Sequence, residues 1–506
     1  MYDPLTYRAD VTPEATALID ADGGEEWSVA DLDAAVERVA GRLVALGVRP
    51  GDRLGVLLPT GPAAVEVIHA AVRLGATLVP LGTRLTPDEL AVRLDRADVT
   101  TLVCDATTAG DAVAAVDTAA DDEGDVPVPV VSVDADIDAA RVTALGAHPP
   151  EAVVPHDWAL DTTLLVPFTS GTTGTPKGVR LTLRNVLASA VASVFRLGLR
   201  RDETWHVALP FHHVGGLTPV LRMPLYGMTV VLRSSFDAEA VAADLDRYDV
   251  TATSLVPTTL SRLLDATSGA LPASLRTVLL GGAPATGTLL DRCVERSVPV
   301  FPTYGMTETA SQIATATPAE AAANPGTVGR PLFWTDLSVH DDDGDERPPG
   351  ETGELVVSGP TVSPGYLDAD ATAAAFDEAG LRTGDVGYRD EKGLFWIVGR
   401  TDDLIVTGGE NVAPAEVVDA LRDHPDVADA AVVGLPDEEW GERVAALVVP
   451  GAGADLSASA LEAHCRDRLA GYKVPRTIQF AAEVSRTDSG TVDREAVRER
   501  LSDSSD

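Results

Sequence analysis

Apolar residues alternate between helical spacing and short continuous runs along the first half of the chain. Between Ser28 and Gly47 they recur every three to four positions, which predicts a helix that Ser28 and Asp31 cap and that Gly47 ends. Residues 53–59 (RLGVLLP) then have the apolar character of a buried strand, and residues 62–74 return to helical spacing. Further runs of strand length follow at residues 77–81, 101–104, 163–168, 229–232 and 276–280. This alternation predicts an α/β fold with layered, mostly parallel sheets.

The pattern changes after residue 353, where the strands become short and are separated by turns. The last hundred or so residues form a separate unit of the small α+β kind. Its helices are expected at 414–423 and 458–469, and its strands at 428–434 and 444–449. Residues 105–160 are rich in Ala, Asp and Pro, so they are expected to hold one short strand, at 130–133, and otherwise surface loops.

The charge of the chain narrows the classes of function. Its 506 residues include 39 Lys+Arg and 78 Asp+Glu, for a formal net charge of −39, while 45% are hydrophobic, as in a folded protein of more than one domain. So much acid repels phosphate backbones, which argues against binding of nucleic acid. Lysine occurs only as Lys177, Lys392 and Lys473. This composition is typical of adaptation to high salt, where ions screen self-repulsion; a GC-rich genome would favour Arg over Lys but would not explain the acid.

Other features set expectations about compartment and metal content. No apolar stretch approaches the ~18 residues of a membrane span, and residues 1–4 (MYDP) do not begin a secretory signal. Cys104, Cys293 and Cys465 are far apart, and no CxxC pair or Cys/His cluster is present. We therefore expect neither a disulfide framework nor a structural zinc site, and we expect the cytoplasm as compartment.

The segment with the clearest chemistry is residues 169–178 (TSGTTGTPKG), directly after the strand expected at 163–168. Glycines let the backbone N–H groups approach an anion, hydroxyls add donors, and Lys177 adds a positive charge. The spacing differs from that of a Walker A loop. The segment therefore predicts a phosphate cradle.

With its flanking residues, this segment (FTSGTTGTPKGV) resembles the signature of the adenylate-forming acyl-CoA synthetases and related ligases. Five further motifs follow in that family's order: 281–284 (GGAP), 304–309 (YGMTET), 382–385 (RTGD), 399–403 (GRTDD) and 408–411 (GGEN). The resemblance covers nearly the whole chain. It implies that ATP and coenzyme A are co-substrates and that Mg²⁺ is a cofactor. It also implies a large N-terminal domain (1–400), a hinge near 400–403 and a small mobile C-terminal domain (401–506).

The resemblance assigns roles that suit the chemistry, because a carboxylate attacking a triphosphate needs cations and N–H donors. Glu308 would ligate Mg²⁺, a hard cation that prefers carboxylate oxygen, and Thr309 would touch the α-phosphate. The β- and γ-phosphates would be held by Thr169, Ser170, Gly171, Thr172, Thr173, Gly174 and Lys177.

Four more residues are implied in nucleotide binding. Asp385 would accept hydrogen bonds from the ribose hydroxyls, although alone it could be a simple turn residue. Tyr304 would lie on or near adenine, Arg400 would contact ribose or phosphate, and Gly282 would belong to the nucleotide site.

The resemblance also implies groups for the acyl site and for domain rotation. His213, in residues 210–216 (PFHHVGG), matches a gate beside the acyl site, with His212 as the alternative. Asp402 matches the pivot of the hinge, although it could be a salt-bridged surface acid. Residues 408–411 match a loop that lines the pantetheine tunnel.

The acid that is activated is suggested by residues 304–313 (YGMTETASQI), whose end resembles o-succinylbenzoate–CoA ligases of menaquinone synthesis. Residues 254–264 and 472–476 also fit that subfamily. A dicarboxylate needs a cation for its non-reacting carboxylate, and Arg222 and Arg262 are both candidates by charge. A ligase for another aryl or medium-chain acid, or a non-catalytic binder of nucleotide or acyl-adenylate, stays open.

One position departs from the family. Residues 489–491 (SGT) place Thr491 where the family has the lysine that enters the site during adenylation. The chain could bind without adenylating, adenylate slowly, or use another cation. For the last alternative Lys473 is the leading candidate, and Arg486 and Arg494 are the others.

Overall fold

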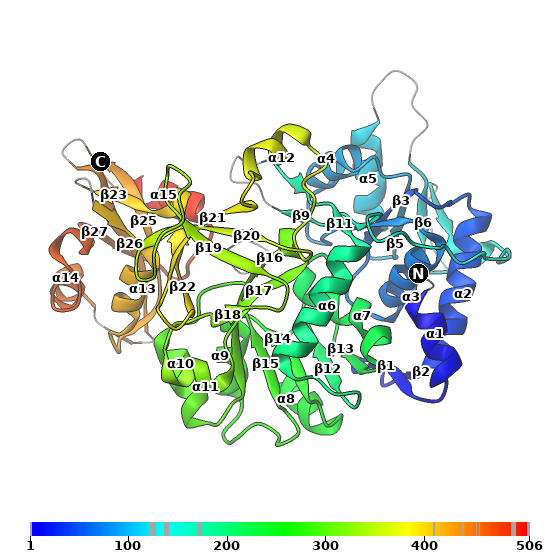
Figure 1. Cartoon of the computed structure of the whole chain (residues 1–506), viewed down its shortest axis with the longest axis horizontal. Helices are drawn as coiled ribbons and strands as arrows, with labels where there is room; N and C mark the ends of the chain where they lie inside the picture. Colours follow the sequence, from blue (N-terminus) through cyan, green and yellow to red (C-terminus); the bar gives the residue numbers. More distant parts are fainter. Residues whose placement is uncertain are drawn as a thin grey trace.

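The computed structural model describes residues 3–120, 128–135, 141–169, 175–407, 410–437, 440–451, 453–454, 456–486 and 492–502. Three large sheets, a two-stranded sheet and their helices build the larger part of the molecule, and a smaller unit with one sheet holds the C-terminal part (Figure 1). The fold is therefore the expected α/β class with a smaller C-terminal α+β unit. Within the described residues, no helix has both the length and the apolar character needed to cross a bilayer.

The first sheet has seven strands in the order β11-β8-β4-β3-β5-β6-β7, and all neighbours except β11 and β8 are parallel. The strands are β3 (Arg53–Leu57), β4 (Thr77–Pro80), β5 (Thr101–Cys104), β6 (Val130–Ser132), β7 (Val142–Ala144), β8 (Thr163–Leu165) and β11 (Leu181–Thr182). The helices that precede or connect them are α1 (Pro4–Val11), α2 (Val29–Ala45), α3 (Pro62–Leu74), α4 (Pro87–Arg96) and α5 (Ala109–Ala119), with a 3₁₀ turn η1 (Leu145–Ala147) after β7.

The predicted start of α2 is confirmed. Ser28 is its N-cap and forms a reciprocal capping box with Asp31, and the buried positions follow the expected helical stripe. Two other expectations were wrong. The strand expected at 163–168 breaks after Leu165, because Phe168 pairs in a separate hairpin. Residues 105–160 contain two strands, β6 and β7, where one was expected, and also α5, whose many alanines form a helix despite a weak apolar pattern.

The second sheet has nine strands in the order β18-β17-β16-β15-β14-β12-β13-β1-β2, with a parallel centre and antiparallel edges. The strands are β1 (Thr16–Asp20), β2 (Glu26–Ser28), β12 (Thr204–Val207), β13 (Thr229–Leu232), β14 (Ala252–Leu255), β15 (Thr277–Leu280), β16 (Val300–Met306), β17 (Ser311–Thr315) and β18 (Arg330–Pro331). The accompanying helices are α6 (Leu183–Leu197), α7 (Val214–Tyr226), α8 (Ala238–Arg247), α9 (Pro257–Ala266), α10 (Gly287–Glu295) and α11 (Pro318–Ala323).

A four-stranded antiparallel sheet, β19-β20-β21-β22, lies between the nine-stranded sheet and the C-terminal unit (Figure 1). It consists of β19 (Asp336–His340), β20 (Thr352–Ser358), β21 (Leu381–Arg389) and β22 (Phe395–Arg400), with α12 (Ala369–Ala375) before β21. The 3₁₀ turn η3 (Thr401–Asp403) leads from β22 into the C-terminal sheet, which has the order β24-β23-β26-β25 with β27 beside β26. This unit contains β23 (Ile405–Thr407), β24 (Glu410–Val412), β25 (Val427–Asp437), β26 (Gly441–Pro450), β27 (Thr477–Phe480), α13 (Pro414–Arg422), α14 (Ala458–Arg466), η4 (Gly471–Lys473) and α15 (Arg494–Ser502).

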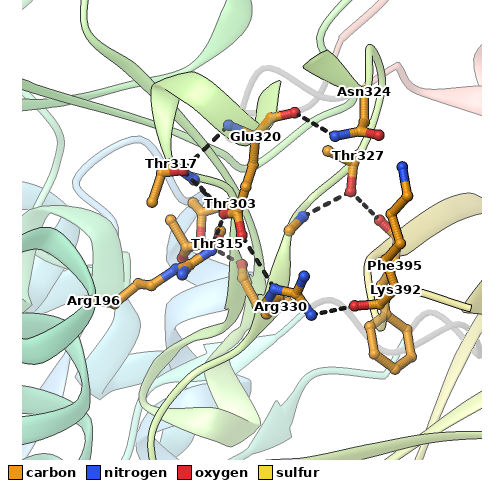
Figure 2. Close-up of polar contacts among 12 residues, drawn as sticks. Arg196, Thr303, Thr315, Thr317, Glu320, Asn324, Thr327, Arg330, Lys392 and Phe395 are labelled. Carbon is orange, nitrogen blue, oxygen red and sulfur yellow. Dashed lines mark hydrogen bonds and ion pairs between the residues drawn. The ribbon is translucent and has the colours of Figure 1, made fainter. Parts of the chain in front are cut away.

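Polar side chains connect the nine-stranded sheet to the four-stranded sheet (Figure 2). Glu320 on α11 accepts hydrogen bonds from Arg196 on α6 and from Arg330 on β18. Arg330 also donates to the backbone carbonyl of Lys392, in the turn before β22. Charge-assisted bonds of this kind fix orientation, so they hold the turn between β21 and β22 against the edge of the nine-stranded sheet.

Candidate active site

The glycine-rich segment is bracketed by a short hairpin. Strand β9 (Phe168–Thr169) pairs with β10 (Lys177–Gly178) so that Thr169 lies opposite Lys177. The two ends of the predicted cradle are thereby brought together. The five predicted residues between them, Ser170, Gly171, Thr172, Thr173 and Gly174, lie outside the described residues.

Glu308 lies in a tight turn at the end of the central strand β16. The 3₁₀ turn η2 (Thr307–Thr309) carries it, and its side chain is buried, with the residue only 8% exposed. Burial raises the pKa of the Glu308 carboxyl above its ordinary value, against the lowering effect of a hydrogen bond from Tyr366. Ala310 follows at φ +56°, a left-handed conformation that costs a non-glycine residue about 1–3 kcal/mol and is common at functional sites.

The turn also places Thr309, which is fully buried. Its hydroxyl donates to the carbonyls of Met306 and Ser311, at 3.0 and 3.2 Å. In this structure the Thr309 hydroxyl therefore holds the turn that presents Glu308.

Asp385 and Tyr304 come together although 81 positions separate them. The Tyr304 hydroxyl donates to Asp385 Oδ2 at 2.6 Å, and Arg400 Nη1 donates to Asp385 Oδ1 at 3.2 Å. Burial raises the pKa of the Asp385 carboxyl, while the Arg400 charge opposes that rise. Three residues that were predicted separately for the nucleotide site thus form one hydrogen-bonded group.

Local backbone geometry explains why glycine precedes Asp385. Gly384 has φ +70°, and a Cβ there would lie 2.8 Å from Arg400 Nη2. Glycine therefore lets Arg400 approach across the β21–β22 pair. Gly282 likewise has φ +81° and follows β15 at the same end of the nine-stranded sheet as Glu308 follows β16.

The two histidines of residues 210–216 stand side by side at the start of α7. His213 is the N-cap of that helix, and its ring centroid lies 4.1 Å from that of His212. Burial lowers the pKa of His212 to about 3, with help from the neighbouring charges of His213, Arg84 and Arg93. His212 is therefore a neutral, packed residue at physiological pH.

The two arginines that could bind the second carboxylate of a diacid differ in their exposure to solvent. Arg262 is exposed on α9, whereas Arg222 on α7 is only 3% exposed. Arg222 donates to the hydroxyls of Ser189 and Ser193 at 2.7 and 3.3 Å, and among the described residues its Nε has no partner. Burial lowers the pKa of the Arg222 guanidinium. Its neighbour Ser189 lies 3.5 Å from the carbonyl of Ala310, beside the Glu308 turn.

The three candidate cations of the C-terminal unit each contact a carboxylate. Lys473 Nζ bonds both oxygens of Glu416 at 2.8 and 2.6 Å. Arg486 bonds Asp429 at 2.7 Å, and Arg494 bonds Asp403 of the η3 turn at 2.8 Å. No recorded contact among the described residues joins any of the three to Glu308.

Other predicted residues of this unit lie in the hinge and in the segments that follow it. Thr491 and residues 408–409 lie outside the described residues. The backbone of Asp402 lies in η3, within the predicted hinge, and that of Asn411 lies in β24, opposite Val406 of β23.

Tyr366 belongs to the site although no sequence argument singled it out. It is 7% exposed, its hydroxyl donates to Glu308 Oε1 at 2.9 Å, and Lys177 Nζ lies 5.3 Å from the centre of its ring. The only signal in the sequence is the pair Gly365-Tyr366 after a proline-rich turn, which is too common to be interpreted alone.

Comparisons with known proteins agree with this geometry. A family described as AMP-binding enzyme matches residues 5–367, and one described as AMP-binding enzyme C-terminal domain matches residues 416–491. The 2-succinylbenzoate–CoA ligase of Bacillus pumilus is 37% identical over 497 residues, which cover 98% of this chain and 97% of that protein.

Solved structures give the same result. The o-succinylbenzoate CoA synthetase of Bacillus subtilis in complex with the acyl-adenylate intermediate OSB-AMP has a TM-score of 0.90 at 36% identity, covering 98% of both chains. The same protein in complex with ATP and magnesium ion has a TM-score of 0.89 at 36% identity, covering 99% of both chains. The fold and site define a nucleotide-dependent class of enzyme, and this chain belongs to the AMP-binding enzyme family.

Proposed function

We propose that this chain is an AMP-forming acid–thiol ligase that converts 2-succinylbenzoate, ATP and coenzyme A into the CoA ester, AMP and pyrophosphate, a step of menaquinone biosynthesis. Support comes from relatives that match along nearly the whole chain and bear this activity in their names. It also comes from a site in which the buried Glu308 is linked through Tyr366 to Lys177 of the phosphate-cradle hairpin, and the buried Asp385 is bonded to Tyr304 and Arg400.

The chemistry proceeds in two displacements. A carboxylate oxygen of the acid attacks the α-phosphorus, the bond to the bridging oxygen breaks, and pyrophosphate leaves. The coenzyme A sulfur, as thiolate, then attacks the acyl carbonyl, and AMP leaves with the bonding electron pair. Lys177 would neutralise the departing phosphates, and the Asp385 group would hold the ribose.

The residues present fit a magnesium ion. The described residues contain no cluster of three or more His, Cys, Asp or Glu side chains that could cage a metal. Mg²⁺ in nucleotide sites instead takes one or two carboxylates together with phosphates and waters, and the buried Glu308 supplies one carboxylate. Bound there, the ion would neutralise charge on the phosphates.

The observation that carries the choice of substrate is Arg222. Among the described residues, the buried Arg222 guanidinium donates to serine hydroxyls and forms no ion pair with a carboxylate, which is unfavourable unless a ligand supplies the anion. We propose that Arg222, rather than the exposed Arg262, faces the non-reacting carboxylate of a dicarboxylic acid.

Pyrophosphate exchange tests this proposal. The substrates are 2-succinylbenzoate and its two monocarboxylic analogues, each lacking one of the two carboxylates. The wild type is expected to prefer the diacid by ~10²-fold over the analogue that keeps the reacting carboxylate, because pairing one buried charge is worth a few kcal/mol.

The matched variants are Arg222→Gln and Arg262→Gln. Arg222→Gln should abolish the preference for the diacid while keeping activity on the monoacid. Arg262→Gln should keep both the preference and the activity. Equal use of all three acids by the wild type would reject the diacid, and no exchange with any acid would reject the ligase in favour of a binder.

We further propose a domain boundary at residues 400–403, since β22 ends the four-stranded sheet there and the C-terminal sheet has its own apolar core around Val417, Leu421 and Val432. We propose the cytoplasm as the compartment. Its support is that Cys104, Cys293 and Cys465 are buried free thiols, as is usual in reducing compartments.

For the lysine that Thr491 replaces, Lys473 remains the proposed substitute. Its ion pair with Glu416 would have to open for it to act in the site. That pair is partly exposed, with 20% of the Lys473 side chain and 46% of the Glu416 side chain accessible, so opening it costs about 1 kcal/mol or less.

A further inference from the structure

The segment before α12 links the phosphate-cradle hairpin to the Glu308 turn. The backbone N–H of Ser363 donates to the carbonyl of Glu308 at 2.7 Å, and the Ser363 hydroxyl donates to the carbonyl of Arg180 at 2.7 Å. The carbonyl of Gly365, two residues after Ser363, accepts a hydrogen bond from the Arg180 N–H at 3.0 Å. Tyr366 then pairs with Val179 in an isolated β-bridge. The backbone of this segment therefore holds both halves of the site.

The approach of this segment to the hairpin is close. Leu367 N–H donates to the carbonyl of Gly178 at 2.8 Å, and a Cβ at Gly178 would lie 2.7 Å from a methyl group of Leu367. A side chain at position 178 would crowd the Leu367 methyl group, so glycine suits this contact. The residue directly after Lys177 is thus adapted to the position of the segment that carries Tyr366.

The Tyr366 side chain makes the same link a second time. Its hydroxyl bonds Glu308 Oε1, and its ring faces the Lys177 ammonium. The ring also packs against Phe376 in a T-shaped arrangement, with centroids 6.3 Å apart. A tyrosine is well suited to this position, because the hydroxyl orients a carboxylate while the ring face attracts a cation.

We propose that Tyr366 is a positioning residue that aims the Glu308 carboxylate at the metal ion of Mg·ATP and holds Lys177 at the same phosphates. The inference rests on the proposed function, since it assumes that Glu308 is the metal ligand. Hydrogen bonds to a ligating carboxylate fix its orientation, and their loss typically costs 10–100-fold in metal affinity.

Calorimetric titration of the full-length protein separates metal-dependent from metal-independent binding. ATP is titrated once with Mg²⁺ and once with EDTA, without acid or coenzyme A. Tyr366→Phe keeps the ring over Lys177 and removes only the hydroxyl. It should weaken Mg·ATP binding by 10–100-fold and leave metal-free ATP binding within about threefold of wild type.

Two further variants locate the effect. Tyr388→Phe removes a hydroxyl from a ring that stacks on Trp396 outside the site, at 5.2 Å, and should change neither titration. In a Glu308→Gln background, Tyr366→Phe should have no additional effect on Mg·ATP binding, because a residue that acts through Glu308 loses its effect when the carboxylate is gone.

The outcomes decide between the inference and the function. Unchanged Mg·ATP binding by Tyr366→Phe, equal weakening with and without metal, or an undiminished effect in the Glu308→Gln background would each overturn the positioning role. If the wild type shows no acid-dependent pyrophosphate exchange, the proposed function is overturned instead, and the titrations can still be interpreted.

Discussion

The proposed metal ligand of the large domain, Glu308, and the candidate cations of the C-terminal unit are held in different ways. Glu308 is 8% exposed and accepts a hydrogen bond from the neutral hydroxyl of Tyr366, whereas Asp385 is equally buried but pairs with Arg400 as well as with Tyr304. Lys473 and Arg494 instead pair directly with carboxylates, and Arg494 retains 39% exposure of its side chain. A buried carboxylate with a neutral donor, such as Glu308, is held firmly and keeps its charge available for a ligand, whereas partly exposed ion pairs are weak and exchange easily. A preorganised nucleotide site and an exchangeable set of cations are what two successive half-reactions require.

The largest effect is expected at Glu308, the buried carboxylate of the large domain. Glu308→Gln removes the carboxylate proposed for Mg²⁺ and should lower acid-dependent pyrophosphate exchange by roughly 10²–10³-fold. Thioester formation from preformed acyl-adenylate should remain within a few-fold, because no pyrophosphate leaves in that step. Parallel loss of both half-reactions would show that Glu308 is needed for the fold and not for adenylation.

The next effect tests the exchangeable cations. Lys473→Ala, Arg486→Ala and Arg494→Ala are compared in the same two assays. The cation that replaces the missing lysine should lose exchange by ~10²-fold and keep thioester formation, and we expect this of Lys473.

Three variants that all retain exchange within a few-fold of wild type would contradict any substitution. Thr491→Lys is the complementary test. It should raise the adenylation rate if its loop still enters the site.

A smaller effect is expected at the hinge that joins the two regions. Asp402→Pro fixes φ near −65° and should restrict rotation of the C-terminal unit. We expect one half-reaction to fall by at least ~10-fold while the other survives. If circular dichroism shows an intact fold and both half-reactions fall equally, Asp402 is not the pivot.

The smallest effect concerns both regions together. At a net charge of −39, repulsion should destabilise the fold in dilute buffer, and salt should screen it. Between about 0.1 and 2 M KCl, where the Debye length falls from roughly 10 to 2 Å, the melting temperature should rise by a few degrees or more. A flat or falling trend would remove the interpretation as a salt-adapted protein.

Much of the fold was predictable because its signals are local. The capping box at Ser28, the apolar stripe of α2 and the short buried strands depend on neighbours within a few residues. The break in the strand expected at 163–168 was not predictable, since Phe168 leaves the seven-stranded sheet only because β10 is there to pair with it. Helix α5 was missed because an alanine-rich helix shows little contrast between its faces.

The sequence by itself determined the family, the order of the motifs and the residue types at the nucleotide site. Only the tertiary structure decided how those residues are joined. Tyr304 meets Asp385 across 81 positions, and Tyr366 meets Glu308 across 58. The tertiary structure also decided that Arg222 is buried and Arg262 is exposed. The sequence could not distinguish these two arginines, because their charge is the same. The physical reason is that motifs depend on local backbone chemistry, whereas burial and partner choice depend on which distant segments the sheets bring together.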